Sequence, residues 1–404
     1  MNLGLSNNII EEENDSFYEM DFDLNKFNQA VVWGTDWTTE TIFNQLKKGN
    51  IDLNPSFQRR DAWSDAEKSR LIESLMLGLP VPPIILAENK KKKNSYIVID
   101  GKQRLLSIRR FFEENDDGAF KPLKLRSLDI LKELNGNTIN QARAEHSEYV
   151  TNIENQSIRT IVIKNWPDEP FLYTVFLRLN TGSKKLSPQE LRQALKPGSF
   201  LDYLDDATAE SSSILRMLNN KTADPRMKDI EITLRFYAFH CFFKEYSGNL
   251  KEFLDMTCEK LNNAWGEKST EIKNLFARLE SAIDFSYEIT DSNSPFSRYI
   301  DGECVGRFNR AIFELFSFYF VHEDIKTMVK NSKDEFMDLF IAMNNDSDFI
   351  SSISGSTKDV NNMHLRFQKF YTLLTSLESY KQTDIAIPKV ELKDGKFNVL
   401  NSLS

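Results

Sequence analysis

Hydrophobic and polar residues follow two different patterns along the chain. Up to about residue 200, amphipathic helical segments alternate with short strand-like runs, which lie at 51–53, 84–87, 96–99 and 157–164. From about residue 200 to 380 the strand pattern ends, and successive amphipathic helices rich in phenylalanine follow. Aromatic stripes of this kind are usually core. The pattern predicts an α+β fold in which a mixed α/β module is followed by an all-α helical module.

Capping residues mark several helix boundaries in the first module. A helix is expected to begin at Thr38 or Thr39 and to end at Gly49. The segments 64–67 and 187–190 each place serine three residues before glutamate, which is the capping-box pattern. Three helix starts are therefore predicted with a physical cause for each.

Changes in composition predict four parts of the chain. Residues 1–35 carry an acidic run and are expected to form a flexible arm. A domain is expected over 36–200, a helical domain over 201–382 and a tail over 383–404, with a short strand near 385–390.

Charge limits the kind of partner. The 404 residues have a net charge of −9, so the chain as a whole is not an electrostatic binder of nucleic acid. Any contact with DNA has to be local. The run Lys90 to Lys93 could face DNA, but a solvated hairpin tip is the favoured interpretation.

Cysteine and histidine usage indicates no zinc or disulfide framework. The three cysteines and four histidines are widely spaced, without C-x-x-C or H-x-x-x-H. No secretory leader and no apolar run of membrane-spanning length is apparent. We expect a cytoplasmic protein that makes no membrane contact.

The segment 95–108, SYIVIDGKQRLLSI, is the strongest local candidate for a binding site. A strand runs into Asp100-Gly101, and an amphipathic helix then begins with Lys102. The backbone N–H groups of such a helix start, its positive dipole end and the side chains of Lys102 and Arg104 suit a phosphate group. Asp100 could instead be only the helix cap.

Several motifs in order extend this signal. Gln58-Arg59 lies in the segment NPSFQRRDAW, followed by GLPVPP at 78–83, DGKQR at 100–104, FLRLNTG at 176–182 and LSPQELR at 186–192. Together they resemble the ParB/sulfiredoxin-like "DGQQR" domain family, as in the N-terminal domain of GmrSD-type modification-dependent restriction enzymes and related phage-defence proteins. Here Lys102 replaces the usual first glutamine, and the resemblance spans roughly residues 36 to 240.

The resemblance implies binding and hydrolysis of a nucleoside triphosphate, ATP or GTP, with Mg²⁺. No P-loop motif is present, so hydrolysis would not use P-loop architecture. The implied catalytic residues are Gln58, Arg59, Asp100, Gln103 and Arg104. The implied nucleotide-binding residues are Gly101, Lys102, Arg104, Arg178 and Asn180, with Asp100 as the candidate Mg²⁺ ligand.

Some assignments stay open. The sequence does not choose between Arg59 and Arg60 except through the family pattern, which favours Arg59. Glu190 is expected to be a capping-box partner rather than a catalytic base. Charged residues of the run 226–236 are expected to form a structural ion-pair lattice between domains, namely Arg226, Asp229, Glu231 and Arg235.

In the family, nucleotide turnover regulates a nuclease, often a C-terminal HNH-type domain. The C-terminal half of this sequence lacks the histidine motif that such a domain needs. The favoured reading is therefore a nucleotide-binding regulatory subunit of an anti-phage or restriction system, acting with a nuclease or other effector protein. The alternatives are a ParB-like DNA-binding or DNA-nicking protein and a non-catalytic interaction scaffold. DNA and a second copy of the chain are further candidate partners.

Overall fold

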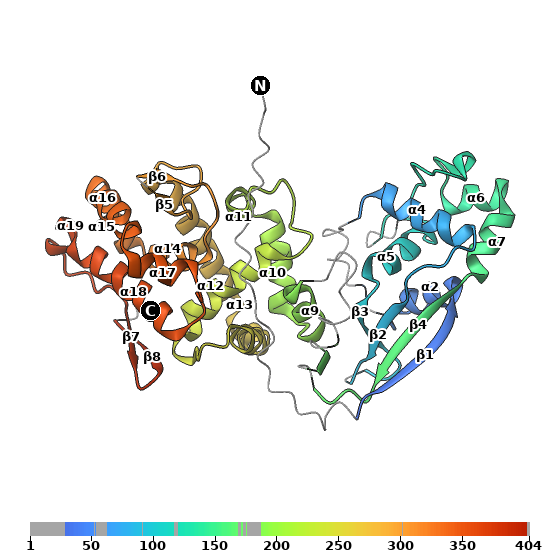
Figure 1. Cartoon of the computed structure of the whole chain (residues 1–404), viewed down its shortest axis with the longest axis horizontal. Coiled ribbons are helices and arrows are strands. Elements are labelled where there is room, and N and C mark those ends of the chain that lie inside the picture. The colour runs from blue at the N-terminus through green and yellow to red at the C-terminus, as the bar shows by residue number, and fades with distance from the viewer. Residues whose placement is uncertain are drawn as a thin grey trace. The chain divides into compact units, whose positions relative to one another are not determined.

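The structure is a computed structural model that describes residues 29–51, 53, 63–90, 92–116, 120–168, 171–172, 175, 187–300 and 302–401. These residues divide into two compact units (Figure 1). One contains 29–197 together with 225–227, and the other contains 198–224 and 228–401. The predicted α+β fold class is confirmed. The predicted division into independent domains stays a prediction.

The first unit is built on a four-stranded mixed sheet with the strand order β1-β4-β2-β3. The strands are β1 (Val31–Thr38), β2 (Ile84–Glu88), β3 (Tyr96–Asp100) and β4 (Ser157–Lys164). β2 runs parallel to β4, whereas β1–β4 and β2–β3 are antiparallel pairs. The β2–β3 pairing and the β4 strand follow the sequence prediction.

Helices pack on this sheet and bury its inner strand β2, whereas the edge strand β1 is mostly exposed. The helices are α2 (Thr39–Lys47), α4 (Asp65–Met76), α5 (Lys102–Phe111), α6 (Ile139–Glu145), α7 (Ser147–Asn155) and α9 (Pro188–Leu195), with a 3₁₀ turn at Lys132–Leu134. Ile85 and Ala87 of β2 pack in one cluster with Leu191 and Leu195 of α9. Because strand side chains alternate between faces, the buried Leu86 between them belongs to the opposite face. Both faces of the central strand are therefore covered.

The N-terminal part of this unit corrects one expectation. Residues 31–35, expected in the flexible arm, lie in β1, which pairs with β4 from Val31–Lys164 to Thr38–Ser157. Two valines and a tryptophan favour a strand, but the partner lies more than 100 residues away, which a local pattern cannot reveal. Residues 1–28 lie outside the described residues. Of the strand expected at 51–53, Ile51 forms a bridge with Tyr96, and residue 52 lies outside the described residues.

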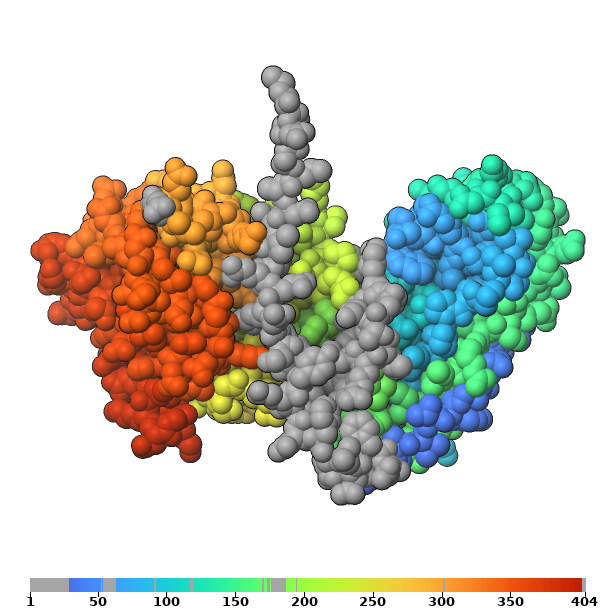
Figure 2. All heavy atoms as spheres, in the orientation of Figure 1, coloured from blue at the N-terminus to red at the C-terminus, as the bar shows by residue number. Residues whose placement is uncertain are grey.

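The second unit is mostly helical, and buried phenylalanines form its core. Its helices are α10 (Ser199–Glu210), α11 (Ser212–Met217), α12 (Lys228–Phe242), α13 (Leu250–Thr290), α14 (Arg310–Phe320), α15 (Glu323–Asn331), α16 (Lys333–Asn344), α17 (Ser347–Ser354), α18 (Val360–Ser376) and α19 (Glu378–Lys381), with a 3₁₀ turn at Phe243–Glu245. Phe313, Phe316 and Phe320 of α14 are buried, as the aromatic pattern predicts. In the space-filling view, the visible orange and red atoms of this unit pack closely against one another (Figure 2).

The predicted helical second module is confirmed, although short strands accompany its helices. It contains two hairpins, β5 (Tyr299–Ile300) with β6 (Glu303–Cys304) and β7 (Lys389–Lys393) with β8 (Lys396–Leu400). The strand expected near 385–390 therefore begins at Lys389. Asp394 and Gly395 between β7 and β8 have φ of 51° and 72°, the conformation of a hairpin turn that Asp-Gly favours. The Asp-Gly dipeptide therefore accounts for the turn between these two strands.

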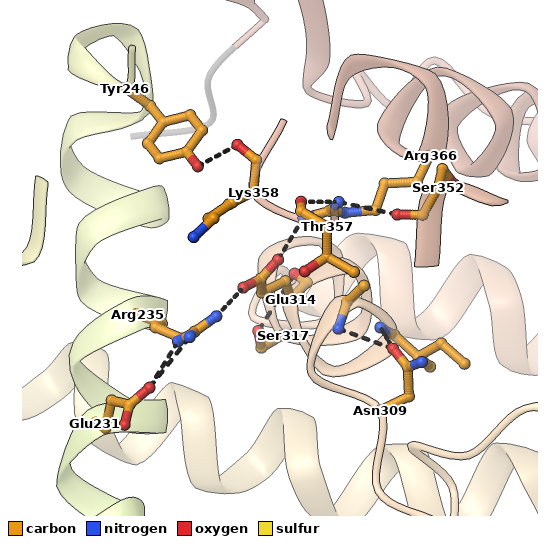
Figure 3. A network of polar contacts seen from close by, with 12 residues as sticks. Glu231, Arg235, Tyr246, Asn309, Glu314, Ser317, Ser352, Thr357, Lys358 and Arg366 are labelled. Carbon is orange, nitrogen blue, oxygen red and sulfur yellow. Dashed lines mark hydrogen bonds and ion pairs between the residues drawn. The ribbon is translucent and has the colours of Figure 1, made fainter. Parts of the chain in front are cut away.

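A network of buried charges joins three helices of the second unit (Figure 3). Glu314 of α14 accepts hydrogen bonds from Arg235 of α12 at 3.3 Å and from Arg366 of α18 at 2.7 Å. Arg235 also donates to Glu231 at 3.1 Å. Two positive and two negative charges compensate each other, which is what burial of charge requires.

No helix in the described part of the chain is long and apolar enough to span a bilayer.

Candidate functional site

The turn between β3 and α5 has the geometry that the sequence predicts. Gly101 is the N-cap of α5 with φ of 99°, and no side chain caps the helix. A Cβ at this position would lie 3.2 Å from Cγ1 of Ile84, so both the backbone conformation and the available space favour glycine. The first turn of α5 contains no acidic residue. The positive end of the helix dipole is therefore not offset from within that turn.

Arg104 is buried in the first turn of α5 and contacts Asp100. Its Nη2 donates to Oδ2 of Asp100 at 2.9 Å and to the carbonyl oxygen of Pro83 at 3.1 Å. Asp100 is 24% exposed, whereas the Arg104 side chain is 8% exposed. The Nε atom of Arg104 is buried and has no hydrogen-bond acceptor in the structure. Asp100 is therefore an ion-pair partner here and does not act as the helix cap.

Lys102 contacts a carboxylate from a distant part of the sequence. Its Nζ lies 2.9 Å from Oε1 of Glu190, and both side chains are only 5% exposed. The second oxygen of Glu190 accepts a hydrogen bond from the Ser187 N–H at 2.6 Å and lies 3.4 Å from Nε of Arg226. Glu190 thus combines the predicted capping-box role, which is confirmed, with a buried ion pair that the sequence did not reveal.

The residues of the charged run 226–236 divide between the units. Arg226 contacts Glu190 in the first unit, while Arg235 contacts Glu231 and Glu314 in the second. Each of these three contacts is made within one unit. The lattice between domains that the sequence suggested stays a prediction.

Helix α9 carries buried polar side chains in addition to Glu190. Gln189, Arg192 and Gln193 are all buried, and Arg192 Nη1 donates to Oε1 of Gln189 at 2.6 Å. Nε2 of Gln189 and Oε1 of Gln193 have no hydrogen-bond partner in the structure. An unsatisfied buried amide costs about 1–3 kcal/mol, so such groups are uncommon unless they serve a purpose. Gln189 lies within the LSPQELR motif, and Gln193 directly follows it.

The remaining candidate residues are placed only in part. Gln103 lies in the first turn of α5 and is partly exposed. Four candidates lie outside the described residues, namely Gln58, Arg59, Arg178 and Asn180. The turn therefore brings together Asp100 to Arg104, and Glu190 joins them through Lys102.

Two further observations concern other ligands. Lys90 of the β2–β3 loop donates to the carbonyl oxygen of Pro167 at 2.8 Å and lies 4.0 Å from the ring of Trp166. Lys92 donates to the carbonyl oxygen of Gly49 at 3.2 Å. Within the described residues, no group of three or more His, Cys, Asp or Glu side chains could hold a metal ion.

Comparison with known proteins agrees with the sequence motifs. Residues 39–195 match the family model described as the GmrSD restriction endonuclease N-terminal domain. This range begins at the first residue of α2 and ends at the last residue of α9, so it contains the β3–α5 turn and Glu190. No curated protein and no solved structure matches the chain. The first unit of this chain thus contains, at residues 39–195, an N-terminal domain of the GmrSD restriction endonuclease family.

Proposed function

We propose that the first unit binds a nucleoside triphosphate with Mg²⁺ at the β3–α5 turn. The chain would then act as a nucleotide-dependent regulatory component of a prokaryotic restriction or anti-phage system. The family of residues 39–195 supports the restriction or defence context. One observation carries the nucleotide proposal: a buried guanidinium, Arg104, lies at a glycine-capped helix start and has an Nε donor without an acceptor.

The chemistry of the turn suits a phosphate group. A phosphate at the start of α5 would accept hydrogen bonds from backbone N–H groups and from Arg104, while the absence of a Cβ at Gly101 permits close approach. Asp100, which is partly exposed, would supply one oxygen to Mg²⁺, and phosphate oxygens and water would supply the others. Gln103 would orient the attacking water.

The Lys102 ammonium has a different role in this proposal. Because it is buried against Glu190, it stabilises the position of α9 relative to the turn and is a weaker candidate for direct phosphate contact. Lys102 is also the residue that departs from the family's motif. Lys102 in place of glutamine then affects how α9 is held beside the turn more than it affects contacts with the phosphate.

A partner completes the proposed system. We propose that a separate nuclease or other effector protein responds to the nucleotide state of the first unit, and that DNA reaches the assembly through that partner. The second unit, whose core is phenylalanine-rich, is the proposed docking module for it.

Calorimetric titration with a panel of nucleoside triphosphates, with and without Mg²⁺, tests the binding step, and release of inorganic phosphate tests turnover. Arg104→Ala should weaken binding by about 1.5–3 kcal/mol, the usual range for a charge-assisted hydrogen bond. Arg159→Ala is the matched control, because this arginine is 57% exposed and pairs with an exposed Asp36. The Arg159→Ala variant should bind nucleotide with the same affinity as the unchanged protein. Folded protein that responds to none of the nucleotides would remove the proposal.

The ParB-like alternative predicts a different result. Under the nucleotide proposal the protein alone, with plasmid and Mg²⁺ or Mn²⁺, leaves the DNA intact. Nicking that disappears in Arg59→Ala or Asp100→Ala would favour the DNA-nicking reading instead. Binding of a partner without any nucleotide response would favour the scaffold.

A further inference from the structure

The β5–β6 hairpin of the second unit carries a cationic pocket that none of the motifs explains. Its volume is about 290 Å³, and its described lining consists of Arg298, Ile300, Val305, Arg307 and Asn309. These residues lie at alternate positions on the two arms of the hairpin. One face of the hairpin therefore forms this pocket.

Backbone pairing holds the two arms together beyond the short strands. The Val305 N–H donates to the carbonyl oxygen of Arg298 at 3.0 Å, and Oγ of Ser297 donates to the carbonyl oxygen of Arg307 at 2.7 Å. Between the lining residues, the side chains of Ser297, Tyr299 and Phe308 are buried. One face of the hairpin therefore packs into the core of the unit, and the face that carries the arginines does not.

Among the described residues, no carboxylate pairs with either arginine of this pocket. Nη1 of Arg298 donates to Oγ of Ser354 at 3.0 Å, and its Nε is buried without an acceptor. Within the described residues, neither Arg298 nor Arg307 forms an ion pair, whereas Arg235 and Arg366 of the same unit do. Two uncompensated guanidinium groups beside one cavity raise the local positive potential despite the net charge of −9.

A helix terminus adds to this potential. Asn309 is the N-cap of α14, and its Oδ1 accepts from the N–H groups of Ala311 and Ile312 at 2.9 and 3.1 Å. The positive end of the α14 dipole therefore lies beside the pocket. The planar array of donors on arginine matches the oxygens of a phosphate group and can bind two of them at once.

We propose that this pocket is a second anion site, which binds a phosphate group between Arg298 and Arg307. It is independent of the β3–α5 turn and of the nucleotide proposal. The phosphate is either that of a nucleic-acid backbone or a free phosphate, since both present the same oxygens to the arginines. The exposed Ile300 and Val305, at 47% and 43% exposure, flank the pocket.

Two probes separate these sources: a 20-base-pair duplex followed by fluorescence anisotropy at low salt, and inorganic phosphate followed by calorimetry. Both are measured on the full chain carrying Arg104→Ala, so that the turn in the first unit does not contribute. Arg307→Ala is the test variant, and its exposed position should leave the fold intact. Lys381→Ala is the control, because it removes one positive charge from an exposed pair in the same unit.

A backbone site predicts that Arg307→Ala weakens duplex binding at least fivefold and lowers the salt slope by about one, while Lys381→Ala changes neither. A free-phosphate site predicts that phosphate binds, that Arg307→Ala abolishes this binding, and that the duplex does not bind. Failure of both probes to bind, or equal effects of the two substitutions, would overturn the proposal.

Discussion

The buried pair of Lys102 and Glu190 gives the sharpest test of how the first unit is stabilised. Lys102→Met removes the ammonium group but keeps a side chain of similar length. Removing one partner of a buried ion pair usually costs about 3–5 kcal/mol. Glu190 keeps two other contacts, the Ser187 N–H at 2.6 Å and Arg226 at 3.4 Å, so the cost should lie near 2–3 kcal/mol.

Urea unfolding of the full chain measures this cost. Glu190→Gln alone, and combined with Lys102→Met, completes a double-mutant cycle, and glutamine can still accept from the N-cap N–H. The double variant should lose less stability than the two single losses added together. Lys260→Met is the control, because its partner Glu245 and Lys260 itself are 46% and 44% exposed. It should cost no more than about 1 kcal/mol.

Two outcomes would refute this reasoning. If Lys102→Met costs no more than the exposed control, burial does not determine the strength of the pair. If Lys102→Met weakens nucleotide binding as much as Arg104→Ala while stability is unchanged, Lys102 contacts the ligand directly and its pairing with Glu190 is secondary.

Three further predictions follow from single contacts. In thermal unfolding, Gly101→Ala should destabilise the first unit by more than Gly49→Ala. Both glycines have positive φ, but only at Gly101 would the added Cβ lie within 3.4 Å of another atom. Equal losses of stability would show that steric contact with the added Cβ does not matter. Glu314→Ala should lower the free energy of unfolding by about 3–5 kcal/mol in urea, because two buried arginines lose their carboxylate partner, and Glu314→Gln should lower it by less. An unchanged free energy of unfolding in Glu314→Ala would show that this network is not needed for stability. Burial lowers the pKa of His240 to about 3 and that of His322 to about 4, below the ordinary 6.5. Between these values the unfolded state binds more protons than the folded state, so the free energy of unfolding should fall as the pH drops from 6.5 toward 4. His240→Phe should reduce this pH dependence.

Local signals explain which parts of the first unit could be predicted from sequence. Both capping boxes, Ser64–Glu67 and Ser187–Glu190, depend on residues three apart, and the structure contains both. The β2–β3 pair and the Gly101 turn are likewise determined by short segments with strong strand and turn preferences. Features of this kind do not require knowledge of distant contacts.

Long-range features were missed for the opposite reason. β1 pairs with β4 across more than 100 residues, and Lys102 meets Glu190 across 88. A hydrophobic pattern gives the period of an element but not its partner. The buried amides of Gln189 and Gln193 are similar, because the sequence identifies a helix start there but not that its polar side chains are buried.

The two cations of the α5 start are compensated in different ways, and this difference bears on how the turn could work. Glu190, buried and held by its N-cap contact, fixes Lys102 in a dry environment. Asp100 is partly exposed and holds Arg104 through one oxygen. A divalent cation drawn to Asp100 would compete with Arg104 for that carboxylate, and the released guanidinium would then be available to an incoming phosphate. Because Asp100 is less buried than Glu190, the Arg104–Asp100 pair can exchange partners at a lower cost than the Lys102–Glu190 pair. Arg104 rather than Lys102 is therefore the side chain through which metal and nucleotide binding at this turn would be coupled.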